Sequence, residues 1–223
     1  MVAILIIRSN FDKLEKNTVE SNLIRVNRLL SSYSSDMTKT VLDWSEWDDT
    51  YQYAIDRNTN YENSNLVPST FSTLKINLFA ILDTSGKIVS VRMYDLSKQE
   101  FIDVPPLLAA TIIDDNAVNL NGSEEISGGL IELPSGLMLF NAGPVLTSKK
   151  EGPARGTLIF GRYLDDTFTG EIAETANLDL TIIPVRNDNY SQVGQVPTGQ
   201  DTRVVPINDK TIEGYSKIKR GCS

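Results

Sequence analysis

The sequence predicts an α+β fold in which long N-terminal helices pack on a mainly antiparallel sheet. Residues 1–67 contain neither glycine nor proline, whereas all 14 glycines and all 9 prolines lie from Pro68 onward. The glycine-free part carries helical spacing of apolar residues, and the later part carries hairpin signals. Because glycine and proline interrupt helices and form turns, we expect helices first and a turn-rich sheet second.

The apolar run Val2–Ile7 at the start of the chain, closed by Arg8, has three interpretations. It is a buried strand, a truncated signal peptide, or the outer end of a transmembrane helix. Six helical residues span only about 9 Å of a hydrocarbon core of about 30 Å. We expect the third interpretation, with residues 1–8 as the remnant of a transmembrane helix.

A heptad pattern follows, in which apolar residues step alternately by four and three positions. Such spacing marks a helix with a narrow apolar seam. The seam packs either on the core of its own domain or against a second copy of the chain. The two interpretations are compatible if they apply to different parts of the helix. The poor helix formers of Ser31–Asp36 predict a kink or restart, and a second helix is expected from Met37 to Ile55. The seam consists of Val19, Leu23, Val26, Leu30, Tyr33 and Met37.

The remaining residues, 58–223, predict the sheet, after a polar connector at residues 58–72. Two apolar runs, at residues 78–83 and 87–94, flank Thr84-Ser85-Gly86 and predict a hairpin. A further helix is expected over residues 165–176, and residues 146–155 form the loop of a longer hairpin. Further strands are expected at Leu137–Ala142, Gly156–Arg162 and Leu178–Val185.

The segment Asp43–Tyr53 concentrates both tryptophans of the chain with two tyrosines and four acidic residues. On a continuous helix, Trp44, Trp47, Asp48 and Tyr51 would share one face. A helix face that is both aromatic and acidic is unsuited to an ordinary hydrophobic core, because a buried carboxylate needs a partner. The segment is therefore the first candidate for a functional surface.

Three segments resemble the CHASE4 family of extracytoplasmic sensory domains in archaeal and bacterial signalling receptors. They are Asp43–Tyr53, the hairpin Asn77–Tyr94, and Gly136–Asp165 with its Gly-Pro and Gly-Arg pairs. Ile212–Tyr215 also resembles the closing strand of the family, and the likeness covers most of residues 10–218. It implies a PAS/Cache-like antiparallel sheet and one sensor domain over residues 9–218, with a helical stalk and second helix at residues 9–57.

Catalysis and cofactor binding find little support in the residues. The chain contains no histidine, which removes the commonest general base and zinc ligand, and its sole cysteine is Cys222. The neighbours Asp48 and Asp49 would point about 100° apart on a helix and do not converge on one substrate. A net charge of −8 argues against binding to nucleic acid. We therefore expect a protein that is not an enzyme, has no cofactor and binds no nucleic acid.

A ligand-binding site is predicted at Trp47, Asp48, Tyr51, Arg92 and Arg162. The aromatic residues offer flat apolar surface with polar tips, the acid can hold an ammonium group or a hydroxyl, and the arginines can bind a carboxylate. In the architectural alternative, Trp47 fills a gap between helix and sheet and Asp48 forms a buried ion pair with Arg162.

The resemblance implies a receptor, which we expect to be a histidine kinase in the cell membrane with this domain extracellular or periplasmic. Its expected partners are a small-molecule ligand, a second copy joined through the N-terminal helix, and the membrane through flanking helices. The family pattern would continue beyond Lys217–Ser223 with another strand and a membrane helix. The alternative is a cell-surface interaction or adhesion module without signalling output.

Overall fold

The computed structural model of the chain describes residues 3–10, 16–105, 108, 126–184, 202–208 and 211–218. The described residues divide into two compact units. Unit 1 draws on residues 1–33 and 164–222, and unit 2 on residues 34–163. The boundaries of the units fall at Tyr33/Ser34 and Tyr163/Leu164. The predicted parts at residues 9–57 and 58–223, within one sensor domain over residues 9–218, stay a prediction.

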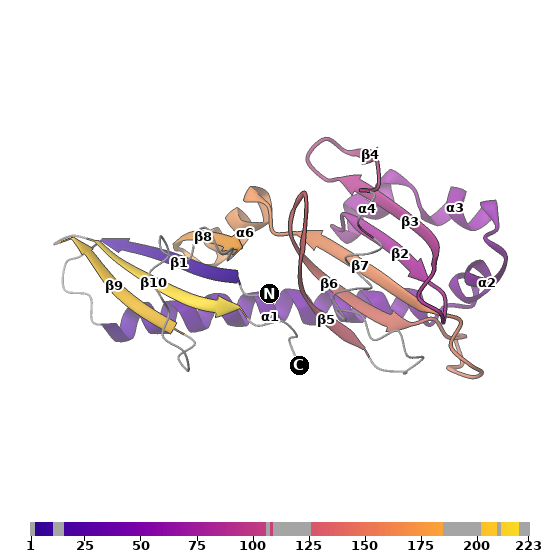
Figure 1. The fold of residues 1–223 in the computed structure, drawn as a ribbon, viewed down its shortest axis with the longest axis horizontal. Helices are drawn as coiled ribbons and strands as arrows, with labels where there is room; N and C mark the ends of the chain where they lie inside the picture. The colour runs from indigo at the N-terminus through magenta and orange to yellow at the C-terminus, as the bar shows by residue number, and fades with distance from the viewer. Residues whose placement is uncertain are drawn as a thin grey trace. The chain divides into compact units, whose positions relative to one another are not determined.

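Unit 1 contains a four-stranded antiparallel sheet with the strand order β8-β1-β10-β9. The start of helix α1 and helix α6 also belong to this unit (Figure 1). The elements are β1 (Ala3–Asn10), α1 (Lys16–Ser45), α6 (Asp166–Ala176), β8 (Asp179–Pro184), β9 (Thr202–Asn208) and β10 (Thr211–Ile218).

Strand β1 corrects the expectation that residues 1–8 are the remnant of a transmembrane helix. The strand pairs with β10 on one side and with β8 on the other, so that Ile6 lies opposite both Tyr215 and Thr181. Ile7 is fully buried. The apolar run is thus a central strand, the first of the three interpretations. Its partners lie far along the chain, and so a local pattern could not identify them. The predicted closing strand at Ile212–Tyr215 is confirmed as part of β10.

Helix α1 continues for 30 residues, without the predicted interruption at Ser31–Asp36. The hydroxyl groups of Thr38 and Thr40 donate to the carbonyls of Ser34 and Asp36, one turn earlier, so they bond within the helix instead of capping a new one. Ser34 itself is buried. The polar residues of this stretch therefore do not interrupt the helix.

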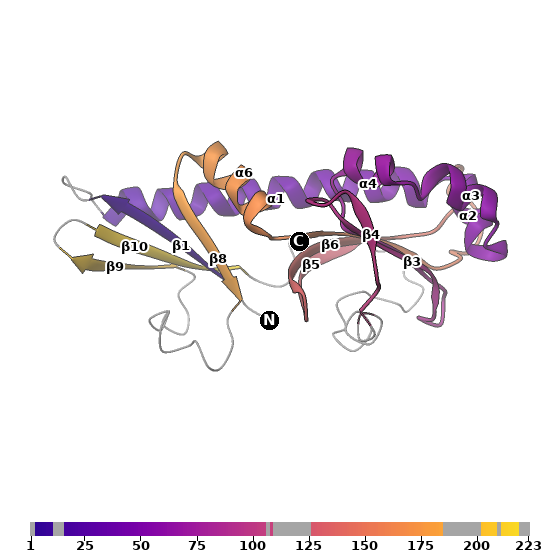
Figure 2. The same ribbon diagram turned by 90° about the horizontal axis from the view of Figure 1, so that it is seen from above.

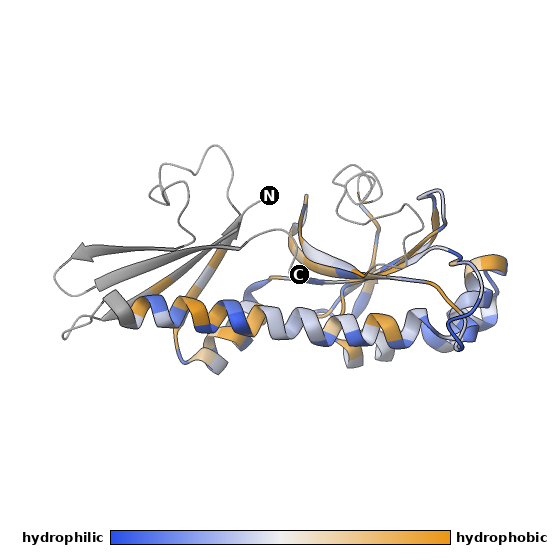
Figure 3. Cartoon of the chain, turned by 90° about the horizontal axis from the view of Figure 1, so that it is seen from below, coloured by the Kyte–Doolittle hydropathy of each residue, from blue (hydrophilic) through white to orange (hydrophobic). Residues whose placement is uncertain are grey.

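The predicted heptad seam packs within its own chain at its N-terminal end. Val19, Leu23, Val26 and Leu30 are buried, and the ring of Tyr33 meets Phe168 of α6 edge-on at 4.9 Å between centroids. Figure 3 shows α1 as a mixture of hydrophilic and hydrophobic turns. Among the helices that the structure describes, none combines the length and hydrophobicity needed to cross a bilayer.

Unit 2 contains a six-stranded antiparallel sheet in the order β4-β3-β2-β7-β6-β5. Figure 2 shows the later part of α1, with α2, α3 and α4, on one face of this sheet. The elements are α2 (Asp48–Asp56), α3 (Thr59–Asn65), α4 (Pro68–Leu74), β2 (Leu78–Leu82), β3 (Ile88–Asp95), β4 (Glu100–Ile102), β5 (Ser127–Leu133), β6 (Gly136–Pro144) and β7 (Thr157–Tyr163).

Strand β2 separates the two hydrophobic clusters of unit 2. Leu78, Ala80 and Leu82 belong to one cluster, while Phe79 and Ile81 belong to the other. Successive side chains of a strand point to opposite faces, so the two clusters cover the two faces of the sheet. The second cluster includes residues of α1 to α4 and is the interface between the helices and the sheet.

Gly156 lies where the β6–β7 loop returns to the sheet. Its φ is +145°, and an added Cβ would stand 1.9 Å from the carbonyl oxygen of Leu82. A side chain is therefore excluded both by the backbone conformation and by a neighbouring main chain. Gly170 on α6 offers a matched contrast, since a Cβ there would meet nothing within 4 Å.

We predict that Gly156→Ala lowers the free energy of unfolding by about 3 kcal/mol or more, because strain and overpacking act together. Gly170→Ala should be neutral or stabilising by up to about 1 kcal/mol, since alanine favours a helix. Thermal unfolding followed by circular dichroism measures both. Equal midpoints for the two variants would show that the Gly156 backbone is not held as described.

Candidate functional site

The break between α1 and α2 creates the corner at which the candidate site lies. Helix α1 ends at Ser45, and Trp47 adopts an extended conformation with φ −109° and ψ 132° before α2 begins at Asp48. The predicted second helix from Met37 to Ile55 is therefore two helices, and the break falls at residues 46–47. Asp48 and Asp49 occupy the first turn of α2, where acidic side chains complement the helix dipole.

The β6–β7 loop, residues 146–155, fastens this corner. The Leu146 amide donates to the carbonyl of Ser45 at 2.9 Å, which satisfies an end carbonyl of α1. Asp48 and Ser148 exchange two hydrogen bonds, because Asp48 Oδ1 accepts from the Ser148 amide at 2.9 Å and the Asp48 amide donates to Ser148 Oγ at 3.3 Å. The bond from the Ser148 amide is the main cause that lowers the pKa of Asp48.

Two charged side chains of the loop add further contacts. Lys150 Nζ lies 2.9 Å from Glu46 Oε2. Arg155 Nε donates to the hydroxyl of Tyr51 at 2.9 Å, and its guanidinium carbon lies 5.6 Å from the centre of the Tyr51 ring. The position of the helix break is therefore set by a loop about 100 residues away in sequence.

An aromatic cluster fills the space beneath the corner. Trp44 meets both Trp47, at 6.1 Å between ring centroids, and Phe160 of β7, at 5.9 Å. Trp47 is 37% exposed and lies 6.2 Å from the ring of Tyr61 on α3. Tyr61 in turn stacks on Tyr53 at 4.4 Å with an interplanar angle of 14°. The cluster connects the exposed indole to the buried face of the sheet.

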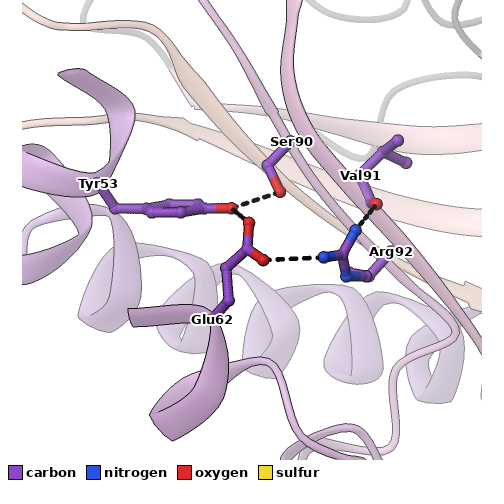
Figure 4. Close-up of polar contacts among 5 residues, drawn as sticks. All are labelled: Tyr53, Glu62, Ser90, Val91 and Arg92. Carbon is purple, nitrogen blue, oxygen red and sulfur yellow. Dashed lines mark hydrogen bonds and ion pairs between the residues drawn. The ribbon is translucent and has the colours of Figure 1, made fainter. Parts of the chain in front are cut away.

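A polar network joins α2 and α3 to strand β3 (Figure 4). The hydroxyl of Tyr53 donates to Glu62 Oε1 at 2.6 Å and lies 2.8 Å from Ser90 Oγ. The other oxygen of Glu62 accepts from Arg92 Nη2 at 3.0 Å. Arg92 Nη1 also donates to the carbonyl of Val91 at 3.3 Å. Three elements are thus held by one carboxylate.

Burial, together with the hydrogen bond to Glu62, raises the pKa of Tyr53 to about 12. The phenol is therefore neutral at physiological pH and keeps the proton that it donates to Glu62. Burial likewise raises the pKa of Tyr61, whose hydroxyl lies 2.8 Å from Thr50 Oγ1. Both tyrosines serve as neutral hydrogen-bonding groups at this corner.

A surface pocket of about 220 Å³ lies between α2 and α3. Each of its lining residues carries a polar group, and the aromatic residue among them is Tyr61. On the other face of the sheet, Leu108 and its apolar neighbours leave a gap of only about 10 Å³. The lining residues of the larger pocket are Asp49, Gln52, Asn58, Asn60, Tyr61, Ser64 and Asn65.

The five predicted site residues occupy three places. Trp47, Asp48 and Tyr51 lie together at the start of α2, where Asp48 bonds to Ser148 and Tyr51 to Arg155. Arg92 lies on β3 and binds Glu62. Arg162 is buried near the end of β7, opposite Leu139 of β6. None of the five lines the pocket between α2 and α3.

Several residues of the corner were not singled out from the sequence, because residues 58–72 were interpreted as a polar connector. The structure places α3 and α4 there. A usable signal was present: the Asn58 side chain caps α3 by accepting from the Tyr61 amide at 2.9 Å, and Pro68 stands in the first turn of α4. Glu62 and Ser90 had no local signal, because their partnership joins distant segments.

The architecture is shared with solved sensor domains. The extracellular domain of vpHK1S-Z8, assigned as a histidine kinase, superposes with a TM-score of 0.57 at 11% identity, covering 94% of this chain and 97% of that one. A domain of a sensory box/GGDEF family protein from Vibrio parahaemolyticus gives 0.54 at 13% identity, covering 92% and 97%. The chain therefore has the fold of a PAS/Cache-like sensor domain, and the predicted α+β fold is confirmed.

The family follows from the sequence comparison. Residues 29–183 match the model of the CHASE4 domain, and the chain belongs to the CHASE4 family. The methanogenesis regulatory histidine kinase FilI of Methanothrix harundinacea (strain 6Ac) is 30% identical over 146 residues, which are 66% of this chain. The chain spans 16% of the length of that relative.

The family match makes this chain a sensor domain of the kind that signalling receptors carry, and not a catalytic domain. Sensor domains of this type bind small ligands and often dimerise. The resemblance inferred from Asp43–Tyr53, Asn77–Tyr94 and Gly136–Asp165 is thus confirmed, since these segments lie within the matched residues.

We predict that Tyr53→Phe and Glu62→Gln each lower the free energy of unfolding by about 1–2 kcal/mol, because each removes a hydrogen bond of a partly buried network. The double variant should cost less than the sum of the two by at least about 0.5 kcal/mol, since the two groups share one interaction. Urea unfolding, followed by the fluorescence of Trp44 and Trp47, measures this coupling.

Glu100→Gln is the control, because Glu100 is an exposed carboxylate on the edge strand β4. It should change stability by no more than about 0.5 kcal/mol. Strict additivity of the Tyr53 and Glu62 substitutions would contradict a network that acts as one unit.

Proposed function

We propose that this chain is the extracytoplasmic ligand-sensing domain of a membrane-bound receptor with histidine kinase output. The observation that carries the proposal is the continuity between α1 and the corner. Helix α1 extends for 30 residues and is separated from α2 only by Glu46 and Trp47. A ligand that changes the corner therefore acts directly on the end of a long helix. The relationship to the kinase FilI supports this output.

Ligand contact is proposed at the corner, with Trp47 as the exposed aromatic surface. Asp48 and Tyr51 contribute by holding the β6–β7 loop against the ligand side of the corner, through Ser148 and Arg155. Arg92, on β3, contributes by fixing the position of Glu62. Arg162 contributes to the proposed site from β7. In this proposal, the helix break at residues 46–47 changes its conformation when the ligand binds, and this change distinguishes the bound state from the free state. The two states must differ in ligand affinity for the ligand to shift their populations.

Dimerisation is proposed through the face of α1 that its own unit leaves exposed. The predicted seam of Val19, Leu23, Val26 and Leu30 is buried within unit 1. Ile24, in contrast, is 48% exposed on the same helix. Two copies meeting along this face would place their α1 helices side by side, and a shift of one would be passed to the other. Attachment to the membrane through flanking helices, with this domain extracellular or periplasmic, belongs to the same proposal.

A thermal-shift screen of amino acids, amines and carboxylates tests ligand contact at the corner. We predict that a compound which raises the unfolding midpoint of the wild-type domain loses most of that effect in Trp47→Ala. Ile55→Ala is the matched control, since Ile55 is an exposed apolar side chain of α2 outside the aromatic cluster. It should respond as the wild type does.

The same compound should change autophosphorylation of the whole receptor in membrane vesicles. Equal shifts for all three proteins would remove Trp47 from the site. Turnover of a glycoside or a peptide by the purified domain would overturn the proposed function itself.

A further inference from the structure

The pocket between α2 and α3 is built from side chains that combine donors and acceptors. Four carboxamides, one hydroxyl and one carboxylate line it together with Tyr61. A carboxamide offers both two N–H donors and a carbonyl acceptor, as a sugar hydroxyl offers both a donor and acceptor lone pairs. None of the lining residues is Lys or Arg. The walls therefore match a ligand rich in hydroxyl groups better than a carboxylate or a phosphate, which prefer cationic donors.

Part of the wall is fixed in advance by Asp56, which stands outside the lining. Gln52 Nε2 donates to Asp56 Oδ2 at 3.0 Å, and Asn58 Nδ2 donates to Asp56 Oδ1 at 2.8 Å. The bond from Gln52 uses its amide nitrogen and leaves its carbonyl oxygen available as an acceptor. Fixed side chains reduce the conformational entropy that a ligand must overcome.

Other lining side chains are available to form hydrogen bonds with a ligand. Within the part of the chain that the structure describes, the side chains of Asp49, Asn60, Ser64 and Asn65 make no hydrogen bond. They come from both helices, with Asp49 on α2 and the other three on α3. A bound molecule could therefore be held from two sides.

Tyr61 gives the pocket a rigid aromatic element. It is only 4% exposed, its hydroxyl is engaged with Thr50, and its ring stacks on Tyr53. Because its ring is stacked on Tyr53 and almost wholly buried, Tyr61 offers a ligand only a small contact area, and the amides around it would make most of the contacts. Asp49 is the sole acid among the lining residues, and so the walls supply one charge for an ammonium group and many groups for hydroxyls.

We propose that this pocket binds a neutral, hydroxyl-rich molecule of monosaccharide size. The inference rests on the proposed function and names the ligand class of the sensor. A volume of about 220 Å³ is below the ~300–1,000 Å³ typical of sites for drug-sized ligands, which restricts the ligand to about one ring. Contact between Tyr61 and Trp47 links an occupied pocket to the exposed indole at the end of α1.

Isothermal titration of the purified chain with glucose, galactose and N-acetylglucosamine tests the proposal, with choline, putrescine and succinate as competing classes. We expect saturable binding of at least one sugar. Asp49→Ala and Asn60→Ala should each weaken it about tenfold or more, the effect of losing one good hydrogen bond. Asn63→Ala is the matched control, because Asn63 is an exposed amide of α3 outside the lining. It should bind as the wild type does.

Three outcomes would overturn the inference: no sugar binds, a sugar binds with equal affinity to all variants, or an amine binds in an Asp49-dependent manner while sugars do not. These failures are distinct from failure of the proposed function. A receptor whose phosphorylation responds to a compound through Trp47, while the pocket variants change nothing, retains the sensing role and loses this pocket. Sugar binding at the pocket without any change in receptor phosphorylation retains the pocket as a binding site and removes the proposed sensing role.

Discussion

The packing of four helices against one face of the six-stranded sheet is the interaction on which the rest of unit 2 depends. Phe79 and Ile81 of β2, with Leu158 and Phe160 of β7, form the sheet side of this interface. The helices contribute their own large side chains, among them Val41, Tyr53, Tyr61 and Phe71. Full burial of such a side chain contributes about 1.5–3 kcal/mol each, so the interface outweighs any single polar contact in the unit.

Polar side chains buried by this packing are paired at two places, whereas Ser45 Oγ at the end of α1 has no hydrogen-bond partner among the described residues. Asn141 of β6 is buried under α1, where its amide donates to Thr38 Oγ1 at 2.7 Å and to Ser34 Oγ at 3.2 Å. The Tyr53, Glu62 and Arg92 network meets the same demand under α2 and α3. An unpaired Asn141 amide or Tyr53 hydroxyl would carry a desolvation cost, because both residues are buried. Glu62 and Arg92 are partly exposed, so water would offset more of the loss at their side chains. The helical layer therefore has a defined register on the sheet, and a change at the corner is resisted until these bonds rearrange.

Elements whose determinants lie close together in the sequence were predicted correctly. The hairpin of β2 and β3 was predicted from Thr84-Ser85-Gly86, and in the structure Asp83 Oδ1 accepts from the amides of Ser85 and Lys87 across that turn. Helix α6 was predicted over residues 165–176, and the Asp165 side chain caps it by accepting from the Phe168 amide. Both signals lie within a few residues of the elements that they define.

The failures share a physical cause, which is dependence on distant partners. The apolar run of β1 is a strand because β8 and β10 supply its hydrogen bonds. The break at Trp47 contains no glycine or proline, and it is stabilised by Leu146 and Ser148 of a remote loop. For the candidate site, Trp47, Asp48 and Tyr51 lie near one another at the start of α2, at a helix break that was not predicted, and their role in ligand binding stays a prediction. The Asn-rich wall of the pocket was not foreseen. Asparagines in a polar stretch are equally compatible with a turn and with the lining of a pocket. Only the packing of α2 beside α3, which a local pattern does not show, distinguishes the two.

Native-state hydrogen exchange tests most directly whether the helical corner and the sheet form one unit. Exchange reports the free energy of opening at each amide, and segments that open together share one value. We expect the protected amides of α2 and α3 to open with the same free energy as those of β3, to which Glu62 and Arg92 connect them. Opening of α2 and α3 at a much lower free energy, with β3 still protected, would contradict it.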